Sequence, residues 1–462
     1  MAGRILILGA GPTGIGAALR LMEAGHTDFL VLEASNRAGG LASSFVDDKG
    51  FTWDIGGHVQ FSHYHRFDRA MEVAIGSDGW LYHERRSYVW IEDRFVPYPF
   101  QNNIRYLGHA SREKCLDGLE QALLEQKKGK KPRDFREWIL ASFGPGIADL
   151  FFFPYNFKVW AYPPEALDYQ WIGERVATVD LDRVKENIRV RRDDVSWGPN
   201  NTFRFPKKGG TGVVWMALAA KIPADRIRYS TPVIGVDLER KEVRTKRGET
   251  VGYDILLSSL PIDELCRLTG DPDLTRLGER MTYSAANIVG VGLKGSCPEA
   301  MSGKCWIYFP EANCPFYRVT VFSNYSPDNV PDISKYWSLM TETSESPLKP
   351  VNAAGLVEET IQGLLNTKLI KRRSDVVSTW MFRAPHGYPT PFLGRDTVLR
   401  EFEAGMRAHN VYSRGRFGGW KYEVSNQDHS FMQGVEAVEN LLFGKPEVTY
   451  NDPGFVNRGT KI

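Results

Sequence analysis

The sequence has few cysteines, no long uncharged apolar run and almost no net charge. The five cysteines include no CxxC pair, and their odd number argues against a disulfide framework and for a reducing, cytoplasmic setting. The most aromatic run, residues 147–160, contains Asp149 and Lys158 and is not expected to span a bilayer. With 58 basic and 56 acidic residues, nothing in the charge balance calls for nucleic acid or an anionic membrane as a partner. The cysteines are Cys115, Cys266, Cys297, Cys305 and Cys314.

The composition is that of a folded protein with a sizeable core. The chain has 462 residues, of which 42% are hydrophobic and 25% charged, and this length exceeds one ordinary domain. No internal repeat and no low-complexity linker divides it. We therefore expect domains that are interwoven rather than arranged in series.

Residues 5–33 predict a complete β-α-β unit. A short apolar run, Ile5 to Leu8, is typical of a strand buried on both faces, and GAGPTG follows it. An amphipathic stretch then ends near Gly25, and Phe29 to Leu32 form a second apolar run before Glu33. In such a GxGxxG turn, one glycine allows the tight turn, one lets backbone approach a pyrophosphate, and one lets helix and strand pack closely. These are Gly9, Gly11 and Gly14, and the acid Glu33 is placed to bind ribose hydroxyls.

The rest of the chain changes periodicity several times. Residues 112–175 show apolar positions at helical spacing, whereas 229–257 contain short β-branched runs. Residues 287–293 and the segments CWIYFP, YRVTVFSNY and YWSLMTET alternate as antiparallel strands do. A final helix is expected to begin near His429.

The segment after Glu33 favours FAD over NAD. It reads ASNRAGGLASS and resembles the second glycine-rich signature of the flavin amine-oxidase and mutase superfamily. GRFGGW, residues 415–420, resembles the C-terminal flavin segment of the same superfamily. The resemblance implies that the following helix points its N-terminus at the flavin pyrimidine. A helix N-terminus carries roughly half a positive charge and would stabilise the anionic reduced flavin.

Seven longer segments resemble the UDP-galactopyranose mutase family, most closely its eukaryotic, fungal-type branch. They are GGHVQFSHY (56–64), VPYPFQNNI (96–104), PYNFKVWAYP (154–163), WGPNNTFRFPKKGGTG (197–212), CWIYFPEANCPFYRVTVFSNYSP (305–327), HGYPTP (386–391) and GRFGGWKYEVSNQDHSFM (415–432). The resemblance runs nearly end to end and is specific, because these strings are long and unusual. One departure is Gln60, which stands in GGHVxF where an aliphatic residue is expected.

The fold implied is α/β, with a Rossmann-like FAD-binding domain interwoven with a helical domain and an antiparallel β-sheet domain. We expect the FAD-binding domain to be discontinuous, at residues 1–80, 206–275 and 405–462. The helical domain is expected at 100–190. The antiparallel-sheet substrate domain is expected at 81–99, 191–205 and 276–404.

Three arginines, each in an aromatic-rich motif, suggest an anion site. Guanidinium forks bind phosphate oxygens bidentately, and tyrosines add donors without adding charge, so a diphosphate is a natural ligand. The alternative is that each arginine forms a separate surface ion pair; only the resemblance implies that they converge. The arginines are Arg175, Arg318 and Arg416, and the tyrosines are Tyr308, Tyr317, Tyr325, Tyr388 and Tyr422.

The resemblance assigns roles residue by residue. The expected catalytic residues are His58, near flavin N(5), and Arg175, Arg318 and Arg416. The residues expected to bind FAD are Gly9, Gly11, Pro12, Thr13, Gly14, Glu33, Arg37, Gly39, Gly40, Leu41, Gly56, Gly57, His58, Val233, Arg416, Gly418, Tyr422, Asn426, Gln427 and Ser430. Those expected to bind the UDP-sugar are Phe61, Tyr98, Phe100, Gln101, Asn156, Trp160, Arg175, Asn200, Trp306, Tyr308, Arg318, Tyr325, Tyr388, Tyr422 and Asn426.

The activity implied is that of a non-redox isomerase that interconverts UDP-galactopyranose and UDP-galactofuranose, for galactofuranose biosynthesis. In that family, N(5) of reduced FAD forms a covalent adduct with the anomeric carbon while UDP leaves and returns. NADPH or NADH is the expected reductant. Arg85 and Ser87 match positions that recognise the adenosine phosphate of NADPH.

Several alternatives stay open. The same chemistry could act on another UDP-sugar, or the fold could serve an FAD-dependent amine or porphyrinogen oxidase, whose aromatic site needs no set of arginines. A flavin- or sugar-nucleotide-binding protein without activity is a third possibility. No metal is expected, because His63 and His65 lack further ligands at a matching spacing. Association into a homo-oligomer is left open.

Overall fold

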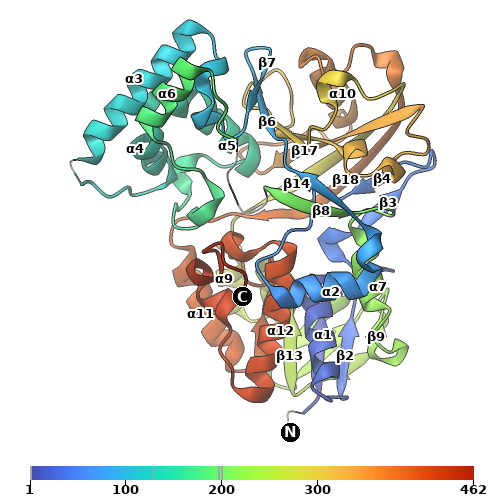
Figure 1. The fold of residues 1–462 in the computed structure, drawn as a ribbon. Coiled ribbons are helices and arrows are strands. Elements are labelled where there is room, and N and C mark those ends of the chain that lie inside the picture. The colour runs from blue at the N-terminus through green and yellow to red at the C-terminus, as the bar shows by residue number, and fades with distance from the viewer. Residues whose placement is uncertain (1–2, 128, 196–197, 199–200) are drawn as a thin grey trace.

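The computed structural model describes residues 3–127, 129–195, 198 and 201–462. Its lower part in Figure 1 is built on a five-stranded parallel sheet with strand order β19-β13-β1-β2-β9. These strands are β1 (Ile5–Leu8), β2 (Phe29–Leu32), β9 (Ile227–Arg228), β13 (Ile255–Ser258) and β19 (Val411–Ser413). Every residue of β1 is buried, which explains its unbroken apolar run. The predicted α/β fold with a parallel nucleotide-binding sheet is confirmed.

Two helices from opposite ends of the chain pack against each other beside this sheet. They are α1 (Pro12–Glu23) and α12 (Gln427–Phe443), so the last predicted helix begins two residues before His429. A Cβ on Gly16 would lie 2.4 Å from the carbonyl oxygen of Phe431, and one on Gly434 would lie 2.0 Å from that of Thr13. The two backbones are therefore in direct contact, which brings both helix N-termini to one cavity.

A seven-stranded sheet forms the upper right part of the molecule in Figure 1, with strand order β18-β14-β17-β16-β15-β6-β7. The strands predicted within residues 287–343 pair antiparallel, as expected. The pair β15–β6 is parallel, so the sheet is mixed rather than wholly antiparallel. The strands are β6 (Tyr88–Ile91), β7 (Arg94–Pro97), β14 (Tyr283–Lys294), β15 (Trp306–Tyr308), β16 (Arg318–Val321), β17 (Tyr336–Glu345) and β18 (Val376–Pro389).

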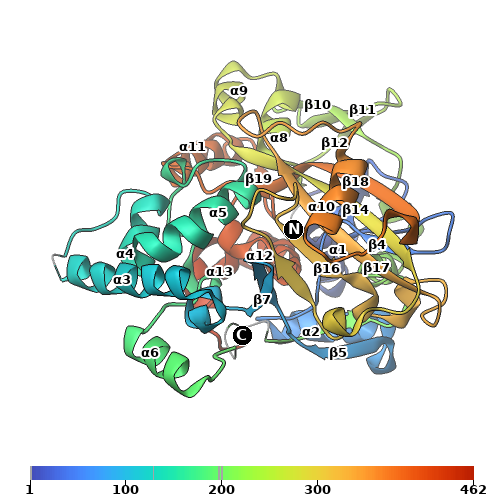
Figure 2. The same cartoon turned by 90° about the horizontal axis from the view of Figure 1, so that it is seen from above.

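A group of helices stands beside the seven-stranded sheet, at the upper left of Figure 1 and on the left of Figure 2. It contains α3 (His109–Gln126), α4 (Phe135–Ile147), α5 (Phe153–Trp160) and α6 (Leu181–Val190). A π-helical turn at Ala148–Phe152 joins α4 to α5. The helical periodicity predicted for residues 112–175 is confirmed.

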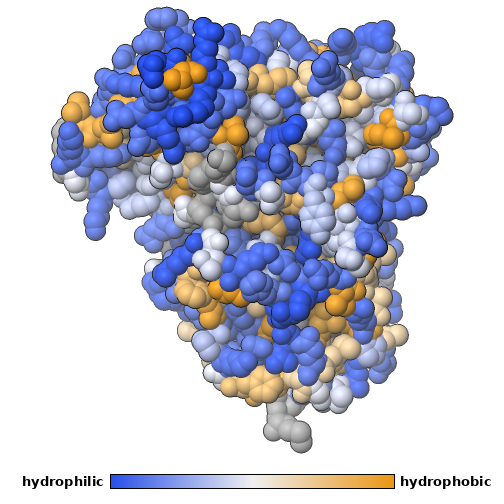
Figure 3. All heavy atoms as spheres, viewed as in Figure 1, coloured by the Kyte–Doolittle hydropathy of each residue, from blue (hydrophilic) through white to orange (hydrophobic). Residues whose placement is uncertain are grey.

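The surface of the molecule is mostly hydrophilic on the face shown in Figure 3, where hydrophobic residues lie in small separate groups. Within the described part of the chain, no helix combines the length and the apolar character needed to cross a membrane. All five cysteines are free thiols.

The remaining helices are α2 (His65–Ile75), α7 (Gly212–Ala219), α8 (Ile262–Thr269), α9 (Pro272–Glu279), α10 (Leu356–Asn366), α11 (Arg395–Arg407), α13 (Val448–Asn451) and α14 (Pro453–Val456). The remaining strands are β3 (Ser44–Val46), β4 (Thr52–Asp54), β5 (Trp80–Glu84), β8 (Thr202–Pro206), β10 (Val233–Asp237), β11 (Glu242–Thr245) and β12 (Thr250–Gly252).

Candidate active site

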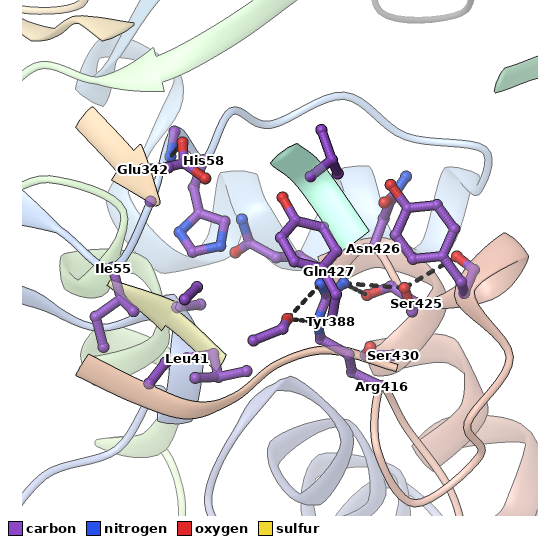
Figure 4. Close-up of a pocket in the computed structure, with 18 of the residues that line it drawn as sticks. Leu41, Ile55, His58, Glu342, Tyr388, Arg416, Ser425, Asn426, Gln427 and Ser430 are labelled. Atoms are coloured by element: carbon purple, nitrogen blue, oxygen red, sulfur yellow. Dashed lines mark hydrogen bonds between the residues drawn. The ribbon is translucent and has the colours of Figure 1, made fainter. Parts of the chain in front are cut away.

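A cavity of about 720 Å³ lies between the parallel sheet and the seven-stranded sheet. The turn after β1, the segment 55–61, strands β17 and β18, and the N-terminus of α12 all contribute to its wall. Figure 4 shows part of this wall, with His58 next to Glu342 on one side and Arg416 beside Ser425 on the other. Residues far apart in sequence therefore meet in one space.

The cofactor side of the cavity is built from backbone. Gly9 has φ +97°, a left-handed conformation that glycine adopts without strain. A Cβ on Gly14 would lie 1.9 Å from the carbonyl oxygen of Gly9, so helix and turn touch here as a dinucleotide-binding turn requires. The N-cap of α1, Gly11, provides no side-chain cap, which leaves the amides of the first turn available to an anion. Gly40 faces Gly11 from the second glycine-rich segment, with 3.4 Å between a Cβ built on it and the Gly11 Cα.

Glu33 lies where a nucleotide ribose is expected. Its carboxylate accepts the backbone N–H groups of Ala10 and Ser35, each at 2.7 Å. Each oxygen has a second lone pair, so the carboxylate can still accept ribose hydroxyls. Together with the open amides of α1, this set of groups fits a dinucleotide such as FAD.

The N-terminus of α12 supplies a second set of open amides. Its N-cap, Asn426, makes no side-chain capping bond. The Gln427 side-chain oxygen accepts from Trp215 Nε1 at 2.7 Å and from Gln60 Nε2 at 2.9 Å. Because an indole N–H can only donate, these bonds fix the orientation of the Gln427 amide. The unusual Gln60, only 2% exposed, thus ties the GGHV segment to the start of α12.

His58 faces the cavity as a neutral imidazole. Burial lowers its pKa from 6.5 to about 4; Glu342 opposes this effect, and Arg416 and Arg318 add to it. Its Nδ1 atom is enclosed and has no hydrogen-bond partner in the described chain. A neutral ring with an unsatisfied nitrogen is suited to contact a flavin or a sugar hydroxyl.

Arg318 is held by a buried acid. Its Nε and one terminal nitrogen donate to the two oxygens of Glu342, both at 2.7 Å. Glu342 also accepts from the Tyr317 hydroxyl at 2.8 Å and from the Gly57 N–H at 3.0 Å. Burial would raise the pKa of Glu342, but Arg318 and the other donors outweigh that effect and lower it. Glu342 therefore stays ionised although it is only 2% exposed.

The other two arginines lack such a partner. Arg416 donates to Gly387 O and Ser425 Oγ, at 2.8 and 2.9 Å, and lies 5.1 Å from the Tyr388 ring. Arg175 donates to a backbone carbonyl at 2.9 Å and lies 4.7 Å from the Tyr422 ring. Neither forms an ion pair with a carboxylate within the described residues. Since both line the same cavity as Arg318, their charge is available to an anionic ligand.

Most of the predicted site residues line this one cavity. From the FAD set these are Gly9, Gly11, Pro12, Thr13, Glu33, Gly40, Leu41, Gly56, Gly57, His58, Arg416, Tyr422, Asn426, Gln427 and Ser430. From the UDP-sugar set they are Phe61, Tyr98, Gln101, Asn156, Trp160, Arg175, Trp306, Tyr308, Arg318, Tyr388, Tyr422 and Asn426, and Arg85 joins them.

A smaller group of predicted residues lies elsewhere. Phe100 is fully buried and stacks on Phe151 at 4.8 Å, and Tyr325 is fully buried in the aromatic core. Arg37 donates to Ser44 O and lies over a phenylalanine ring. Asn200 falls outside the described residues. The remaining predicted residues that do not line the cavity are Gly14, Gly39, Ser87, Val233 and Gly418.

Sequence reasoning missed Glu342 and the role of Gln60. The signal for Glu342 was an acid in the middle of β17, where its neighbours Thr341 and Thr343 are buried. An ionisable residue at a buried strand position needs a charged or hydrogen-bonding partner, and this requirement would have indicated a buried ion pair. In the sequence Gln60 stands out only as a departure from the family pattern, and its bond to Gln427 joins segments that are far apart in the chain.

His63 groups with Asp428 and His429 rather than with His65. His63 Nδ1 and Asp428 Oδ2 are 2.7 Å apart, and the two imidazole rings stack at 4.6 Å with 25° between their planes. Each of the three residues offers a ligand atom within 4.8 Å of the others, close enough to hold a metal ion. Both ring nitrogens of His429 are enclosed without a hydrogen-bond partner among the described residues, and the expectation that no metal binds stays a prediction.

Comparison with known proteins agrees with this site. Residues 12–412 match the family described as flavin containing amine oxidoreductase. A crystal structure of reduced UDP-galactopyranose mutase is 47% identical, with 100% of this chain and 98% of that chain covered and a TM-score of 0.96. Two structures share the fold alone: a candidate protoporphyrinogen oxidase from Exiguobacterium (16% identity, 96% and 100% covered, TM-score 0.70) and a putrescine oxidase (15%, 96% and 99%, 0.65). The chain therefore belongs to the flavin-containing amine oxidoreductases and, among them, to the UDP-galactopyranose mutase family.

Proposed function

We propose that the protein is an FAD-dependent mutase that interconverts UDP-galactopyranose and UDP-galactofuranose. The observation that carries this proposal is the convergence of Arg175, Arg318 and Arg416 on the cavity that holds the dinucleotide turn. An amine or porphyrinogen oxidase has no anionic leaving group for three arginines to hold. A UDP-sugar has one, because its diphosphate takes up negative charge as the glycosidic bond breaks.

The cofactor side holds and tunes the flavin. Reduced FAD, when bound, supplies an electron-rich nitrogen that can attack the anomeric carbon. The open amides of α1 hold the pyrophosphate, and Glu33 binds a ribose. The first-turn amides of α12 stabilise negative charge on the ring. His58, being neutral, contacts the ring without adding a charge. The domain that does this is the one proposed at 1–80, 206–275 and 405–462.

The opposite side holds UDP while the sugar rearranges. Arg175 and Arg318, with Tyr388 and Tyr422, bind the diphosphate and keep it in place for its return. Arg416, Asn426 and the two tryptophans Trp160 and Trp306 surround the sugar. Tyr98 and Gln101 hold the uracil, because an aromatic face stacks on a base and an amide reads its edge.

The proposal extends to the eukaryotic, fungal-type branch, to NADPH as reductant and to the cytoplasm. Arg85 supports the second point: it lines the cavity, and its guanidinium lies 5.4 Å from the Tyr98 ring. Stopped-flow reduction by NADPH tests it. The Arg85→Ala protein should need more NADPH for half-maximal reduction, and an unchanged apparent affinity removes Arg85 from this role. The free cysteines support a reducing compartment.

One experiment tests the main proposal. Purified protein loaded with FAD is reduced with dithionite and incubated with UDP-galactofuranose, and the nucleotide sugars are separated by chromatography. We expect conversion to UDP-galactopyranose by reduced protein and almost none by oxidised protein. Full activity of oxidised protein would contradict the mechanism, and no conversion in either state would contradict the function. UDP-arabinopyranose in a parallel reaction tests the alternative sugar.

A further inference from the structure

We propose that Glu342 is a positioning residue that couples the diphosphate-binding Arg318 to the Gly57–His58 segment beside the flavin. This inference rests on the proposed function, since it gives Arg318 a diphosphate to bind. Glu342 lines the cavity, but its carboxylate oxygens are engaged by Arg318, Gly57 and Tyr317. It acts through Arg318 and Gly57.

The hydrogen bonds of Glu342 reach both sides of the cavity. Its Oε1 atom accepts from Arg318 Nε and from the Gly57 N–H, at 2.7 and 3.0 Å. Its Oε2 atom accepts from the other Arg318 nitrogen and from the Tyr317 hydroxyl, at 2.7 and 2.8 Å. Each oxygen thus accepts one hydrogen bond from Arg318 and a second one from Gly57 or Tyr317. The carboxylate cannot shift toward Arg318 without loosening Gly57.

Gly57 has no room to move independently of this carboxylate. A Cβ on Gly57 would lie 2.7 Å from Thr320 Oγ1, 2.8 Å from Trp306 Nε1 and 3.3 Å from Glu342 Oε1. Its backbone is therefore pressed against the sheet that carries Arg318 and Glu342. The next residue, His58, forms the cavity wall. A displacement of Arg318 by a bound diphosphate is transmitted to His58 by these contacts.

Arg318 differs from Arg175 and Arg416 in how its charge is used. Glu342 takes up Nε and one terminal nitrogen, so one edge of the guanidinium is occupied and its other terminal nitrogen is left for a ligand. The charge of Arg318 is compensated before a ligand arrives, whereas the other two arginines are held by neutral groups. Glu342 thus limits the strength of diphosphate binding and fixes its direction, which suits a site that must release UDP and take it back.

The test compares Glu342→Gln with a matched control, Glu345→Gln. Glu345 lies three residues further along β17 and forms an equivalent two-bond pair with Arg383, at 2.9 and 3.0 Å, but does not line the cavity. Both variants are loaded with FAD. Four quantities are measured: the Kd of UDP, the change in the flavin absorption spectrum when UDP is added, the kcat of the reduced protein, and the midpoint of thermal unfolding.

For Glu342→Gln we expect a Kd of UDP equal to or tighter than wild type, because Arg318 is no longer compensated. We expect the UDP-induced flavin spectral change to be lost and kcat to fall on the order of 10- to 100-fold, the loss that a small misplacement of groups at the reacting centre causes. Glu345→Gln should match wild type in the Kd of UDP, the spectral change and kcat. A merely structural role would instead weaken UDP binding together with thermal stability.

The inference is overturned if Glu342→Gln keeps the spectral change and a kcat within about threefold of wild type, well below the loss expected from misplacement. The inference is also overturned if Glu342→Gln weakens UDP binding and lowers thermal stability together. Should Glu342→Gln not fold, Glu342→Asp keeps the charge but is too short to reach both Arg318 and Gly57, and it should lose the spectral change too. If wild type shows no mutase activity, the proposed function fails, while the Kd and spectral measurements still decide the coupling.

Discussion

The two walls of the cavity recognise their ligands by different means. The cofactor wall uses backbone: left-handed and close-packed glycines, and the uncapped N-termini of α1 and α12. The substrate wall uses side-chain charge: three arginines, a buried glutamate and a set of phenols. The first depends on how closely the chain can approach itself. The second depends on where charges are placed and how they are compensated.

This difference predicts opposite sensitivities. On the cofactor wall, a single added methyl group is harmful even though it changes no charge. On the substrate wall, a change that keeps both size and charge but loses the fork geometry is harmful.

Replacing Gly14 with alanine should have the largest effect. The new Cβ would lie 1.9 Å from the Gly9 carbonyl oxygen, so helix and turn must separate. We expect a loss of about 3 kcal/mol in the free energy of unfolding and loss of FAD binding, measured by urea denaturation and by flavin absorbance. Gly252→Ala is the control, since the nearest atom to its Cβ is 4.0 Å away. Normal FAD binding by Gly14→Ala would show that the backbone does not set recognition on this wall.

Arg318→Lys should disable the substrate wall while keeping its charge. An ammonium group cannot reproduce the two parallel bonds to Glu342, which leaves a buried carboxylate poorly paired. We expect kcat/KM of the reduced enzyme to fall about 100-fold, roughly 2.7 kcal/mol, with FAD binding unchanged. Arg383→Lys changes a comparable pair whose arginine side chain is 44% exposed. Its loss in kcat/KM should correspond to at most about 1 kcal/mol. Equal effects of the two variants would contradict a special role for this pair.

His58 should make the stability of the folded protein depend on pH. Burial lowers its pKa from 6.5 to about 4, so between these values the unfolded chain binds more protons than the folded one. The resulting stability is fully present above pH 6.5 and is lost as the pH falls toward 4. In urea denaturation of the protein without FAD, wild type should lose up to about 2 kcal/mol more than His58→Gln between pH 7.5 and 5. If the two proteins lose stability in parallel as the pH falls, burial does not lower the pKa of His58 in the folded protein.

Gln60→Leu should have the smallest effect. It removes the bond from Gln60 Nε2 to Gln427, but Trp215 still holds the Gln427 oxygen. The Gln60 oxygen has no partner within the described chain, so its removal offsets part of the loss. We expect a destabilisation of about 0.5 kcal/mol and a kcat within fivefold of wild type. A larger loss would mean that this tether, rather than the helix N-terminus alone, sets the flavin environment.

The parts of the site that the sequence predicted are those formed by neighbours in the chain. The β-α-β unit, its three glycines and Glu33 lie within residues 5–33, and the strand and helix patterns there follow from local periodicity. The antiparallel strands between 287 and 343 were predicted for the same reason, whereas the parallel β15–β6 pair joins segments more than two hundred residues apart and leaves no local pattern. Long family-like segments added the residues of the substrate wall, and only that resemblance implied that its arginines converge.

What the sequence alone determined was therefore the type of cofactor turn, the mixture of sheets and the presence of arginines in aromatic motifs. Only the tertiary structure decided which of these face one cavity, and which, such as Phe100 and Tyr325, are packed into the core. It also revealed Glu342 and the Gln60–Gln427 tether. The physical reason is that burial, compensation of charge and hydrogen-bond partnership depend on distances between segments that come together only when the chain folds.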